Sequence, residues 1–375
     1  MKVMHIMDSL NRGGAEVLAL DVCRNARAAG LELTFVATGG GDLEEDFRNS
    51  GVDFVRLQRR APVDLRLAAR LRRVVRERGV RVVHTHQAVE ALHAHLATLG
   101  TKVKRVMSFH LCEADAKNRA ALKLLAPLTD ANVAVSRDLL RCLHTQAGFD
   151  TDRNFRAVYN GVDARRLRGD GRRVRDELKL HDSHLLLGMV GNFYADRRKD
   201  QLTVCRALVR VFAREPRAHF AFVGARDTQA PRVFEECVEF CREHAIGARV
   251  HFLGKRADIP DILDALDVFV LSSRHEGLGI AAVEAMMTGT PAVVSDLGPL
   301  LEVAGGGEYA AVFRAGDSED LSERLLELVG DSARRARLGE RGREWAQTQF
   351  GIEAHLASLG ELYASLAPPP GGRGR

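Results

Sequence analysis

Short apolar runs alternate with longer amphipathic segments along most of the chain, and this alternation restricts the fold more than any other feature. The apolar runs have the length and composition of strands, at residues 3–7, 33–37, 52–57, 80–85, 105–109, 131–135 and 155–159. Between them lie helical patterns such as 64–79, in which leucine and valine share one face and arginine covers the rest. Strands that alternate with helices predict βαβ units and a mostly parallel sheet.

A second series of strand-like runs begins near residue 185, at residues 185–190, 219–224, 249–254, 268–272 and 291–295. The polar segment 160–184 separates the two series and reads as their connection. We therefore predict an α/β fold of two doubly wound, Rossmann-like domains that face each other across a cleft. Their expected extents are 1–163 and 164–350, followed by a C-terminal helix at 351–366 that packs back on the first domain and a disordered tail at 367–375.

The composition is that of a globular protein, with 46% hydrophobic and 28% charged residues. No apolar run approaches the roughly 18 residues that a membrane span needs, and the N-terminus lacks the pattern of a secretory signal. The six cysteines are scattered along a long chain, which favours buried free thiols in the cytoplasm over a disulfide framework. Cys237 and Cys241 lie one helical turn apart, but no second ligand pair accompanies them, so a metal site is not favoured.

The net charge of +5 is distributed unevenly, because residues 1–160 carry +7 and the remainder −2. The basic half fits an anionic partner such as a membrane surface or a phosphorylated ligand. Nucleic acid is not favoured, since no binding motif accompanies the charge. The arginines of 64–81 either dock on anionic lipid at the inner face of the membrane or form the solvated face of an ordinary helix.

Two loops that follow strands are suited to hold phosphate. Gly13 and Gly14 lie between the first strand and the first helix, where backbone N–H groups and the helix dipole favour an anion. The spacing is not that of the dinucleotide fingerprint, and an ordinary turn is the alternative. In the second domain, Arg197, Arg198 and Lys199 follow the first strand and could clamp a diphosphate, or form a solvated charge run.

The stretch RHEGLGIAAVEAMMTGTP, residues 274–291, places one glutamate on a glycine loop and another inside the helix that the loop opens. Glu284 lies among alanine, valine and methionine, so its charge is costly unless it has a partner. A carboxylate would repel a diphosphate, whereas it would accept hydrogen bonds from sugar hydroxyls. We therefore expect Glu276 and Glu284 each to bind one of two sugars, with phosphate held by backbone N–H groups and cations.

With these features the chain resembles the retaining glycosyltransferases of family 4, which have the GT-B fold. The resemblance covers nearly the whole chain, and its most specific part is the Glu-x7-Glu pattern at 276–296. The other residues that carry it are Gly13 and Gly14, His110, VAVS at 133–136, YNGVD at 159–163 and Lys199.

The resemblance implies a role for each of these positions. Glu284 would bind the ribose of a nucleotide sugar, Lys199 would neutralise the diphosphate with help from Gly14, and His110 would lie beside the reacting carbon. The expected catalytic residues are His110, Glu276 and Lys199. The expected donor-binding residues are Gly13, Gly14, Asn192, Arg198, Lys199, Glu276, Gly277, Leu278, Gly279, Ile280 and Glu284.

One position departs from the family pattern, because Asn192 stands where an arginine is common. Arg197 or Arg198 could supply the missing donor to the leaving phosphate, and we favour Arg198 because it adjoins Lys199. The implied mechanism is a front-face displacement in which the departing phosphate helps to deprotonate the acceptor hydroxyl. It requires neither a metal nor another cofactor.

Four histidines within HTHQAVEALHAH, His84, His86, His93 and His95, offer a metal site as an alternative interpretation. His84 and His86 point the same way on a strand, whereas His93 and His95 face apart on a helix. The family often has a similar strand-end pair, which favours a structural or acceptor-side role.

The expected activity is transfer of a sugar from a nucleotide diphosphate donor, a UDP-sugar by preference, to an acceptor hydroxyl. The acceptor would be a polysaccharide of the cell envelope, a glycolipid or a secondary metabolite. The expected location is the cytoplasm, with possible peripheral contact of the basic domain with the membrane. A sugar-nucleotide epimerase and a catalytically inactive binding protein are the alternatives.

Overall fold

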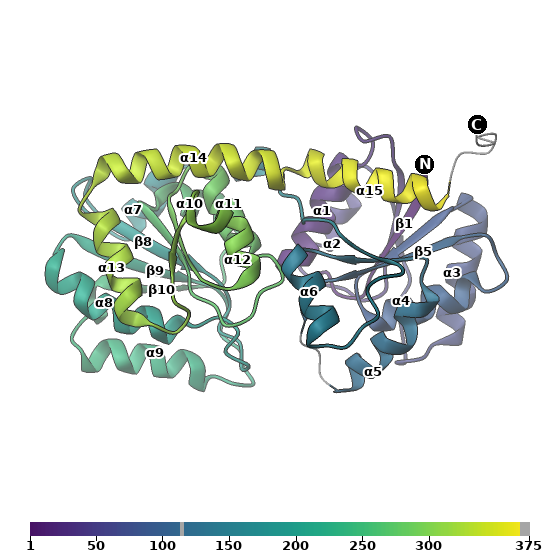
Figure 1. The fold of residues 1–375 in the computed structure, drawn as a ribbon, viewed down its shortest axis with the longest axis horizontal. Coiled ribbons are helices and arrows are strands. Elements are labelled where there is room, and N and C mark those ends of the chain that lie inside the picture. The colour runs from purple at the N-terminus through teal and green to yellow at the C-terminus, as the bar shows by residue number, and fades with distance from the viewer. Residues whose placement is uncertain (113–115, 368–375) are drawn as a thin grey trace. The chain divides into compact units, whose positions relative to one another are not determined.

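A computed structural model describes residues 1–112 and 116–367, which divide into two compact units (Figure 1). Unit 1 comprises residues 1–162 together with the chain from residue 350 onward, and unit 2 comprises residues 163–349. Except for Ala367, the predicted disordered tail lies outside the described residues. Among the residues described, no helix combines the length and apolar character needed to span a membrane.

Unit 1 is built on a parallel sheet that has seven strands in the described residues, in the order β3-β2-β1-β4-β5-β6-β7. The strands are β1 (Lys2–Met7), β2 (Glu32–Ala37), β3 (Asp53–Arg56), β4 (Val82–Thr85), β5 (Lys104–Phe109), β6 (Ala131–Ala134) and β7 (Phe155–Ala157). The helices are α1 (Gly14–Asn25), α2 (Glu44–Arg48), α3 (Leu65–Arg78), α4 (Ala88–Thr98), α5 (Ala116–Leu125), η1 (Ala126–Leu128), α6 (Arg137–Thr145) and α15 (Ile352–Leu366).

Helices cover both faces of this sheet, and the alternation of side chains along β1 shows which core each face builds (Figure 1). Val3 and Met7 belong to a core shared with α1 and α15, whereas Met4 and Ile6 belong to a core shared with α3 and α4. His5 therefore points toward the first core, from which α15 approaches.

Unit 2 repeats the architecture with a parallel sheet of six strands among the described residues, in the order β10-β9-β8-β11-β12-β13. The strands are β8 (Leu185–Val190), β9 (Ala218–Val223), β10 (Val250–Gly254), β11 (Val268–Leu271), β12 (Ala292–Ser295) and β13 (Ala311–Phe313). The helices are η2 (Ala164–Leu167), α7 (Gly171–Glu177), α8 (Gln201–Arg214), α9 (Arg232–Glu243), η3 (Gly247–Arg249), α10 (Ile259–Ala265), α11 (Ile280–Thr288), α12 (Gly298–Val303), η4 (Gly305–Gly307), α13 (Ser318–Val329) and α14 (Ser332–Phe350).

The two sheets confirm the predicted fold class of two doubly wound, parallel α/β domains. In each sheet the strand order reverses beside the first strand, next to β1 in unit 1 and next to β8 in unit 2. Open parallel sheets bind ligands outside the carboxyl ends of the strands at such a reversal. The short strand β13 is absent from our prediction.

Residues 160–184, which the sequence indicated as the connection between the two series of strands, also contribute elements to the second domain. Most of this segment belongs to unit 2, where it forms η2 and α7, and Arg175 of α7 donates to the backbone oxygen of Ala265 at 3.0 Å. Gly171 permits close packing within unit 2, because a Cβ at this position would lie 2.5 Å from the backbone nitrogen of Ala265.

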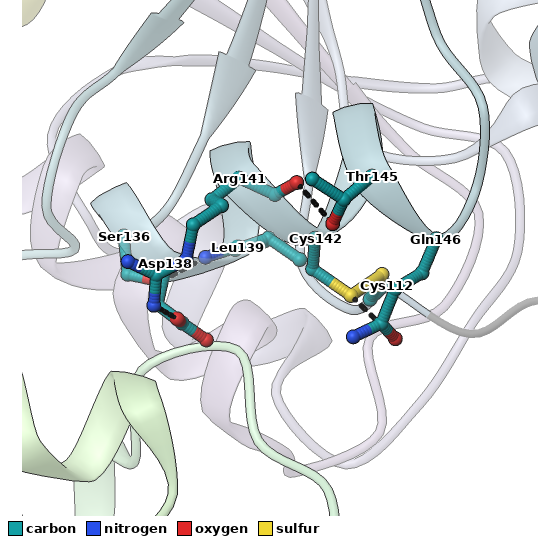
Figure 2. Close-up of a disulfide and its surroundings, with 8 residues drawn as sticks. All are labelled: Cys112, Ser136, Asp138, Leu139, Arg141, Cys142, Thr145 and Gln146. Carbon is teal, nitrogen blue, oxygen red and sulfur yellow. Dashed lines mark hydrogen bonds and ion pairs between the residues drawn. A yellow bond between two sulfur atoms is a disulfide. The ribbon is translucent and has the colours of Figure 1, made fainter.

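The prediction of free thiols without disulfides was wrong for two cysteines, because Cys112 and Cys142 form a disulfide between the loop after β5 and α6 (Figure 2). These elements adjoin the neighbouring strands β5 and β6, so the fold brings together cysteines that lie 30 residues apart. Cys23, Cys205, Cys237 and Cys241 are buried free thiols, as predicted. The cysteines therefore do not indicate a reducing compartment.

Helix α15 returns to unit 1 and docks over Gly161, the glycine of the YNGVD motif. A Cβ at this position would lie 2.6 Å from the Cβ of His355 and 2.9 Å from the Cα of Ile352. The ring of His355 donates from Nδ1 to the backbone oxygen of Tyr159 at 2.6 Å, and the backbone N–H of Ile352 donates to the oxygen of Val162 at 3.0 Å. The motif therefore serves the packing of α15.

We expect Gly161→Ala to destabilise the protein by roughly 1–3 kcal/mol, because the new methyl group overpacks the contact with α15. Gly360→Ala is the matched control on α15, since a Cβ there meets nothing within 4 Å. The control should stabilise the helix by about 0.5–1 kcal/mol. Urea unfolding followed by circular dichroism compares the two variants, and equal effects would contradict the proposed close packing.

Candidate active site

Two loops of unit 2 meet at the carboxyl ends of the neighbouring strands β8 and β11. Residues 191–200 follow β8 and residues 272–279 follow β11, and the backbones pair at Lys199 and Ser273. The backbone N–H of Asp200 donates to the oxygen of Ser272 at 2.9 Å, and that of Arg274 donates to the oxygen of Arg198 at 2.9 Å. These bonds fix the loop 191–200, which carries Lys199, in one register against the loop 272–279, which carries Glu276.

Lys199 and Glu276, predicted from separate motifs, form an ion pair in this structure. The side chains are only 13% and 10% exposed, so little water screens the pair. The hydroxyl of Ser273 donates to the same carboxylate oxygen of Glu276 at 2.8 Å. The stem of Lys199 runs beside Gly191, where a Cβ would lie 3.4 Å from its Cγ. The lysine is thus positioned by the loop that follows β8.

Glu284 lies on α11 and is buried, and its partner was missed by sequence reasoning. A guanidinium nitrogen of Arg166 in η2 lies 2.5 Å from Oε1 of Glu284. The only signal in the sequence was the apolar surroundings of Glu284, which require a cation without indicating which one. The charge pair is confined to unit 2, since η2 and α11 both belong to it.

The loop between Glu276 and α11 presents backbone N–H groups at the start of the helix. Gly279 has φ +94°, and a Cβ there would lie 2.4 Å from a methyl of Leu300, so the position needs glycine. Within the described part of the chain, the N–H groups of Leu278, Gly279 and Ile280 donate no hydrogen bond. A helix N-terminus of this kind favours an anion or an oxygen acceptor.

The remaining predicted donor-binding residues of unit 2 are engaged with protein groups. The carboxamide of Asn192 accepts the N–H of Ala225 at 2.8 Å and donates to the hydroxyl of Tyr194 at 3.3 Å. Arg198 lies over the ring of Tyr194 at 4.7 Å and bonds to Asp196, which lowers the pKa of that carboxyl.

In unit 1, Gly13 caps α1 and Gly14 is its first residue, at the carboxyl end of β1. Gly13 is extended, at φ −148°, so it is not required for its conformation. A Cβ on Gly13 would lie 2.6 Å from a carboxylate oxygen of Glu16, and burial raises the pKa of Glu16. The glycine therefore leaves room for an acidic side chain at the helix start, a group that our prediction did not include.

His110 follows β5 and is partly exposed, with its Nε2 3.2 Å from Nδ1 of His86. The rings of His84 and His86 stack with centroids 4.9 Å apart, on the face of the sheet that also holds His5. Burial lowers the pKa of His110 to about 4 and of His5 to about 3. Among residues 1–112 and 116–367, no group of three or more histidine, cysteine or acidic side chains is arranged to hold a metal ion.

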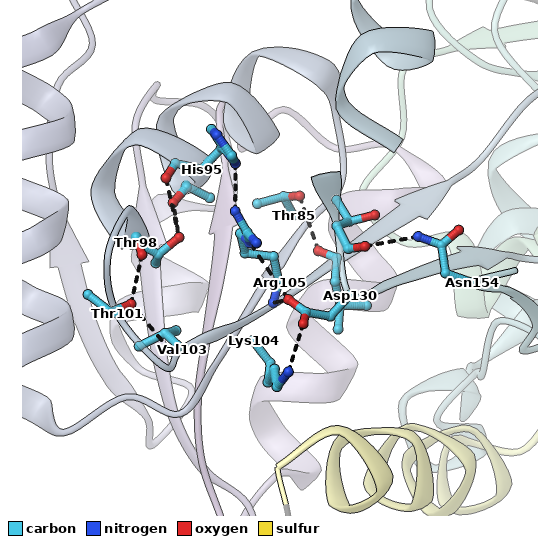
Figure 3. Close-up of polar contacts among 12 residues, drawn as sticks. Thr85, His95, Thr98, Thr101, Val103, Lys104, Arg105, Asp130 and Asn154 are labelled. Carbon is cyan, nitrogen blue, oxygen red and sulfur yellow. Dashed lines mark hydrogen bonds and ion pairs between the residues drawn. The ribbon is translucent and has the colours of Figure 1, made fainter. Parts of the chain in front are cut away.

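The other two histidines of the cluster make structural contacts. His93 donates from Nδ1 to the oxygen of Val89 at 2.6 Å and accepts the N–H of Asp64 on Nε2 at 2.9 Å. His95 accepts from Arg105, whose backbone N–H donates to Asp130 (Figure 3). Burial, and then Arg105, lower the pKa of His95.

Family models match both parts of the chain. Residues 12–166 match the model described as Glycosyltransferase Family 4, and residues 184–331 match that described as Glycosyl transferases group 1. The chain is a family 4-like glycosyltransferase. Its fold is GT-B, as the resemblance implied.

Similar proteins have varied names. This glycosyltransferase is 24% identical over 366 residues to N-acetyl-alpha-D-glucosaminyl L-malate synthase of Bacillus anthracis, covering 94% of this chain and 93% of the relative. It is 26% identical to the lipopolysaccharide core biosynthesis mannosyltransferase LpsB of Rhizobium meliloti, and the match covers 77% of this chain and 80% of the relative. The crystal structure of Anabaena HepE in complex with UDP and glucose is similar at a TM-score of 0.86 and 20% identity, covering 97% of this chain and 100% of that one.

Four buried histidines of unit 1, together with the partly exposed His110, give the glycosyltransferase a stability that depends on pH. Burial lowers the pKa of His5, His110 and His355 to about 3, 4 and 4, and that of His84 and His86 well below its usual value. The unfolded chain therefore binds protons below pH 6.5 that the folded chain does not bind until about pH 4. Glu90 makes the opposite contribution to the pH dependence of stability, because burial raises its pKa to about 8.

We expect the free energy of unfolding to fall as the pH is lowered from 7 to 5, by up to about 1.4 kcal/mol per pH unit for each such histidine. His355→Gln should reduce this slope by about one proton, because glutamine does not titrate and can still donate to Tyr159. Urea titrations at several pH values measure both slopes. Equal stability of the unaltered protein at pH 7 and pH 5 would contradict the proposed burial of neutral imidazoles.

Proposed function

We propose that this glycosyltransferase is a retaining enzyme that transfers a sugar from a UDP-sugar to an acceptor hydroxyl without a metal or other cofactor. The observation that carries the proposal is the pairing of Lys199 with Glu276 at the reversal of strand order in unit 2. One cation and one carboxylate lie together there, beside the unbonded N–H groups of Leu278, Gly279 and Ile280 in the described chain. Such a site matches a ligand that carries both phosphate and hydroxyl groups.

Binding of the donor would exchange the partners of the Lys199–Glu276 ion pair. The diphosphate is the stronger anion and competes for Lys199, which leaves Glu276 to accept hydrogen bonds from the transferred sugar. Glu284 is held on α11 by Arg166, and its second oxygen can accept from the ribose hydroxyls. The N–H groups at 278–280 then contact the sugar and phosphate oxygens.

The chemistry breaks the bond between the sugar carbon and the diphosphate oxygen and forms a bond to the acceptor oxygen on the same face. Negative charge develops on the departing diphosphate, which takes up the proton of the acceptor hydroxyl. Lys199 and the helix N-terminus stabilise that charge, and stabilisation of this kind is commonly the largest catalytic term. Arg198, next to Lys199 in the loop, adds a second positive charge once a phosphate displaces Asp196 from its guanidinium.

UDP is favoured as the carrier because the similar Anabaena HepE is solved with UDP and glucose. In unit 1, His110 and the Gly13–Gly14 helix start lie at the carboxyl ends of β5 and β1, where a sheet of this type binds ligands. These residues are assigned to the sugar and the phosphate, respectively.

We expect UDP to raise the melting temperature of the unaltered protein in the presence of EDTA, and to do so more than ADP or GDP. Glu284→Gln should weaken binding roughly 10- to 100-fold, because it removes a charged hydrogen-bond acceptor worth about 1.5–3 kcal/mol. The matched control is Glu308→Gln, an exposed carboxylate of unit 2 that is paired with Arg341.

Thermal shifts across a titration of UDP give both affinities. Absence of a shift with every nucleotide would reject the donor site and favour an inactive binding protein. Turnover of the UDP-sugar separates the remaining alternatives, since a transferase consumes the donor with an acceptor present, whereas an epimerase would interconvert it alone.

We also propose that the outer face of α3 contacts anionic lipid, so that the acceptor is lipid-linked or part of an envelope glycan. This α3 surface consists of Leu65, Arg66, Arg72, Arg73 and Arg76, all exposed. Leu65 is 69% exposed at the start of the helix, which is unusual for a large apolar side chain. Arg66 and Arg76 form no side-chain ion pair within the described residues. The name of the R. meliloti relative, which refers to lipopolysaccharide core biosynthesis, agrees with such an acceptor.

We expect the protein to sediment with vesicles that contain phosphatidylglycerol and not with pure phosphatidylcholine, and to be released by high salt. The double variant Arg66→Glu and Arg76→Glu should bind roughly 30-fold more weakly, because each lost arginine contributes about 1 kcal/mol. The control is Arg206→Glu with Arg214→Glu on α8 of unit 2, which makes the same change in net charge. Equal losses in the two double variants would show that net charge alone is responsible.

A further inference from the structure

A continuous chain of hydrogen-bonding side chains crosses the interior of unit 1 from His110 toward helix α15. Nε2 of His110 lies 3.2 Å from Nδ1 of His86, and Nε2 of His86 lies 3.4 Å from Nδ1 of His5. Nε2 of His5 lies 3.0 Å from the hydroxyl of Tyr363 on α15.

The chain of hydrogen bonds continues beyond Tyr363 to His84 on β4 and Ser108 on β5. The hydroxyl of Tyr363 lies 2.5 Å from Nδ1 of His84, and Nε2 of His84 lies 2.7 Å from the hydroxyl of Ser108. His5 and His84 are register partners on β1 and β4, so both reach the face where α15 packs. A single phenol hydroxyl therefore joins the two halves of the chain.

Every inner member of this chain is neutral and uses both of its hydrogen-bonding positions. Burial lowers the pKa of His5, His84 and His86 and raises that of Tyr363. A neutral imidazole has one N–H and one acceptor nitrogen, and a phenol has one O–H. Each inner group must then donate at one end and accept at the other, so all links point in the same direction.

The distances at Tyr363 decide that direction. An O–H donor makes shorter contacts than an N–H donor, about 2.7 Å against about 2.9 Å. We therefore assign the 2.5 Å contact with His84 to donation by the tyrosine O–H, and the 3.0 Å contact to donation by the N–H of His5 to the tyrosine oxygen. It follows that His86 donates to His5 and that His110 donates to His86 from Nε2.

We propose that Tyr363 is a positioning residue that fixes the tautomer of His110 through His5 and His86. His110 then carries its proton on Nε2 and presents an unprotonated Nδ1, which has no hydrogen-bond partner in the described part of the chain. Such a nitrogen accepts a hydrogen bond from a ligand hydroxyl and repels a phosphate oxygen. This inference rests on the proposed function, in which His110 lies beside the sugar, and it specifies that His110 acts there as an acceptor.

The test is nuclear magnetic resonance of the full chain with ¹⁵N-labelled histidine, in which the two ring nitrogens report the tautomer directly. We expect His110, assigned from the His110→Asn variant, to be in the Nε2–H form. In Tyr363→Phe, the N–H of His5 loses its acceptor and the chain loses its direction. His110 should then shift toward a mixture of both tautomers, whereas Tyr309→Phe in unit 2 should leave it unchanged.

Ser108→Ala is a second variant for use if Tyr363→Phe does not fold, because it removes the acceptor at the far end of the chain and should shift His110 in the same direction. An Nδ1–H form of His110 in the unaltered protein, or no change in the folded variants, would overturn the inference. The measurement needs no substrate. A tautomer shift in a protein that binds no nucleotide would therefore reject the proposed function alone, and unchanged tautomers in an active protein would reject this inference alone.

Discussion

The reversal of strand order in each parallel sheet is the constraint on which the rest of this structure depends. It leaves the carboxyl ends of β8 and β11 next to each other without a crossover helix between them, so their loops can pair. Lys199 and Glu276, which lie 77 residues apart, meet for this reason. In unit 1 the same reversal places β1 beside β4, and the histidines of the two strands come into register.

The sequence features that predicted the fold are local patterns. They predicted strands and helices correctly because these elements are themselves local. Apolar runs and amphipathic periods report burial within a few residues, so strand and helix positions could be predicted in both units. The alternation of His84 and His86 likewise predicted that they share a face. The exceptions are the short strand β13, which was not predicted, and the polar segment around Gly171, whose close packing in unit 2 has no local signal.

The partners across the sequence could not be predicted, because they depend on which elements the topology makes neighbours. The need of Glu284 for a cation was evident from its surroundings, yet nothing distinguished Arg166 from the other arginines of the chain. The Cys112–Cys142 disulfide was missed because scattered cysteines carry no spacing signal. Tyr363 lies 279 residues from His84, and no local pattern relates them.

The C-terminal helix α15 does more than cover a core, because its polar side chains also contact the sheet of unit 1. Its apolar face packs with that of α1, which would by itself hold it on unit 1. A buried phenol and a buried imidazole add nothing to such packing unless their polar atoms are satisfied. Tyr363 and His355 satisfy theirs on β1, β4 and the YNGVD segment, so the helix has one register on the sheet. The same contacts that specify the docking of α15 thus set the protonation of the side chains beneath it, which end at His110.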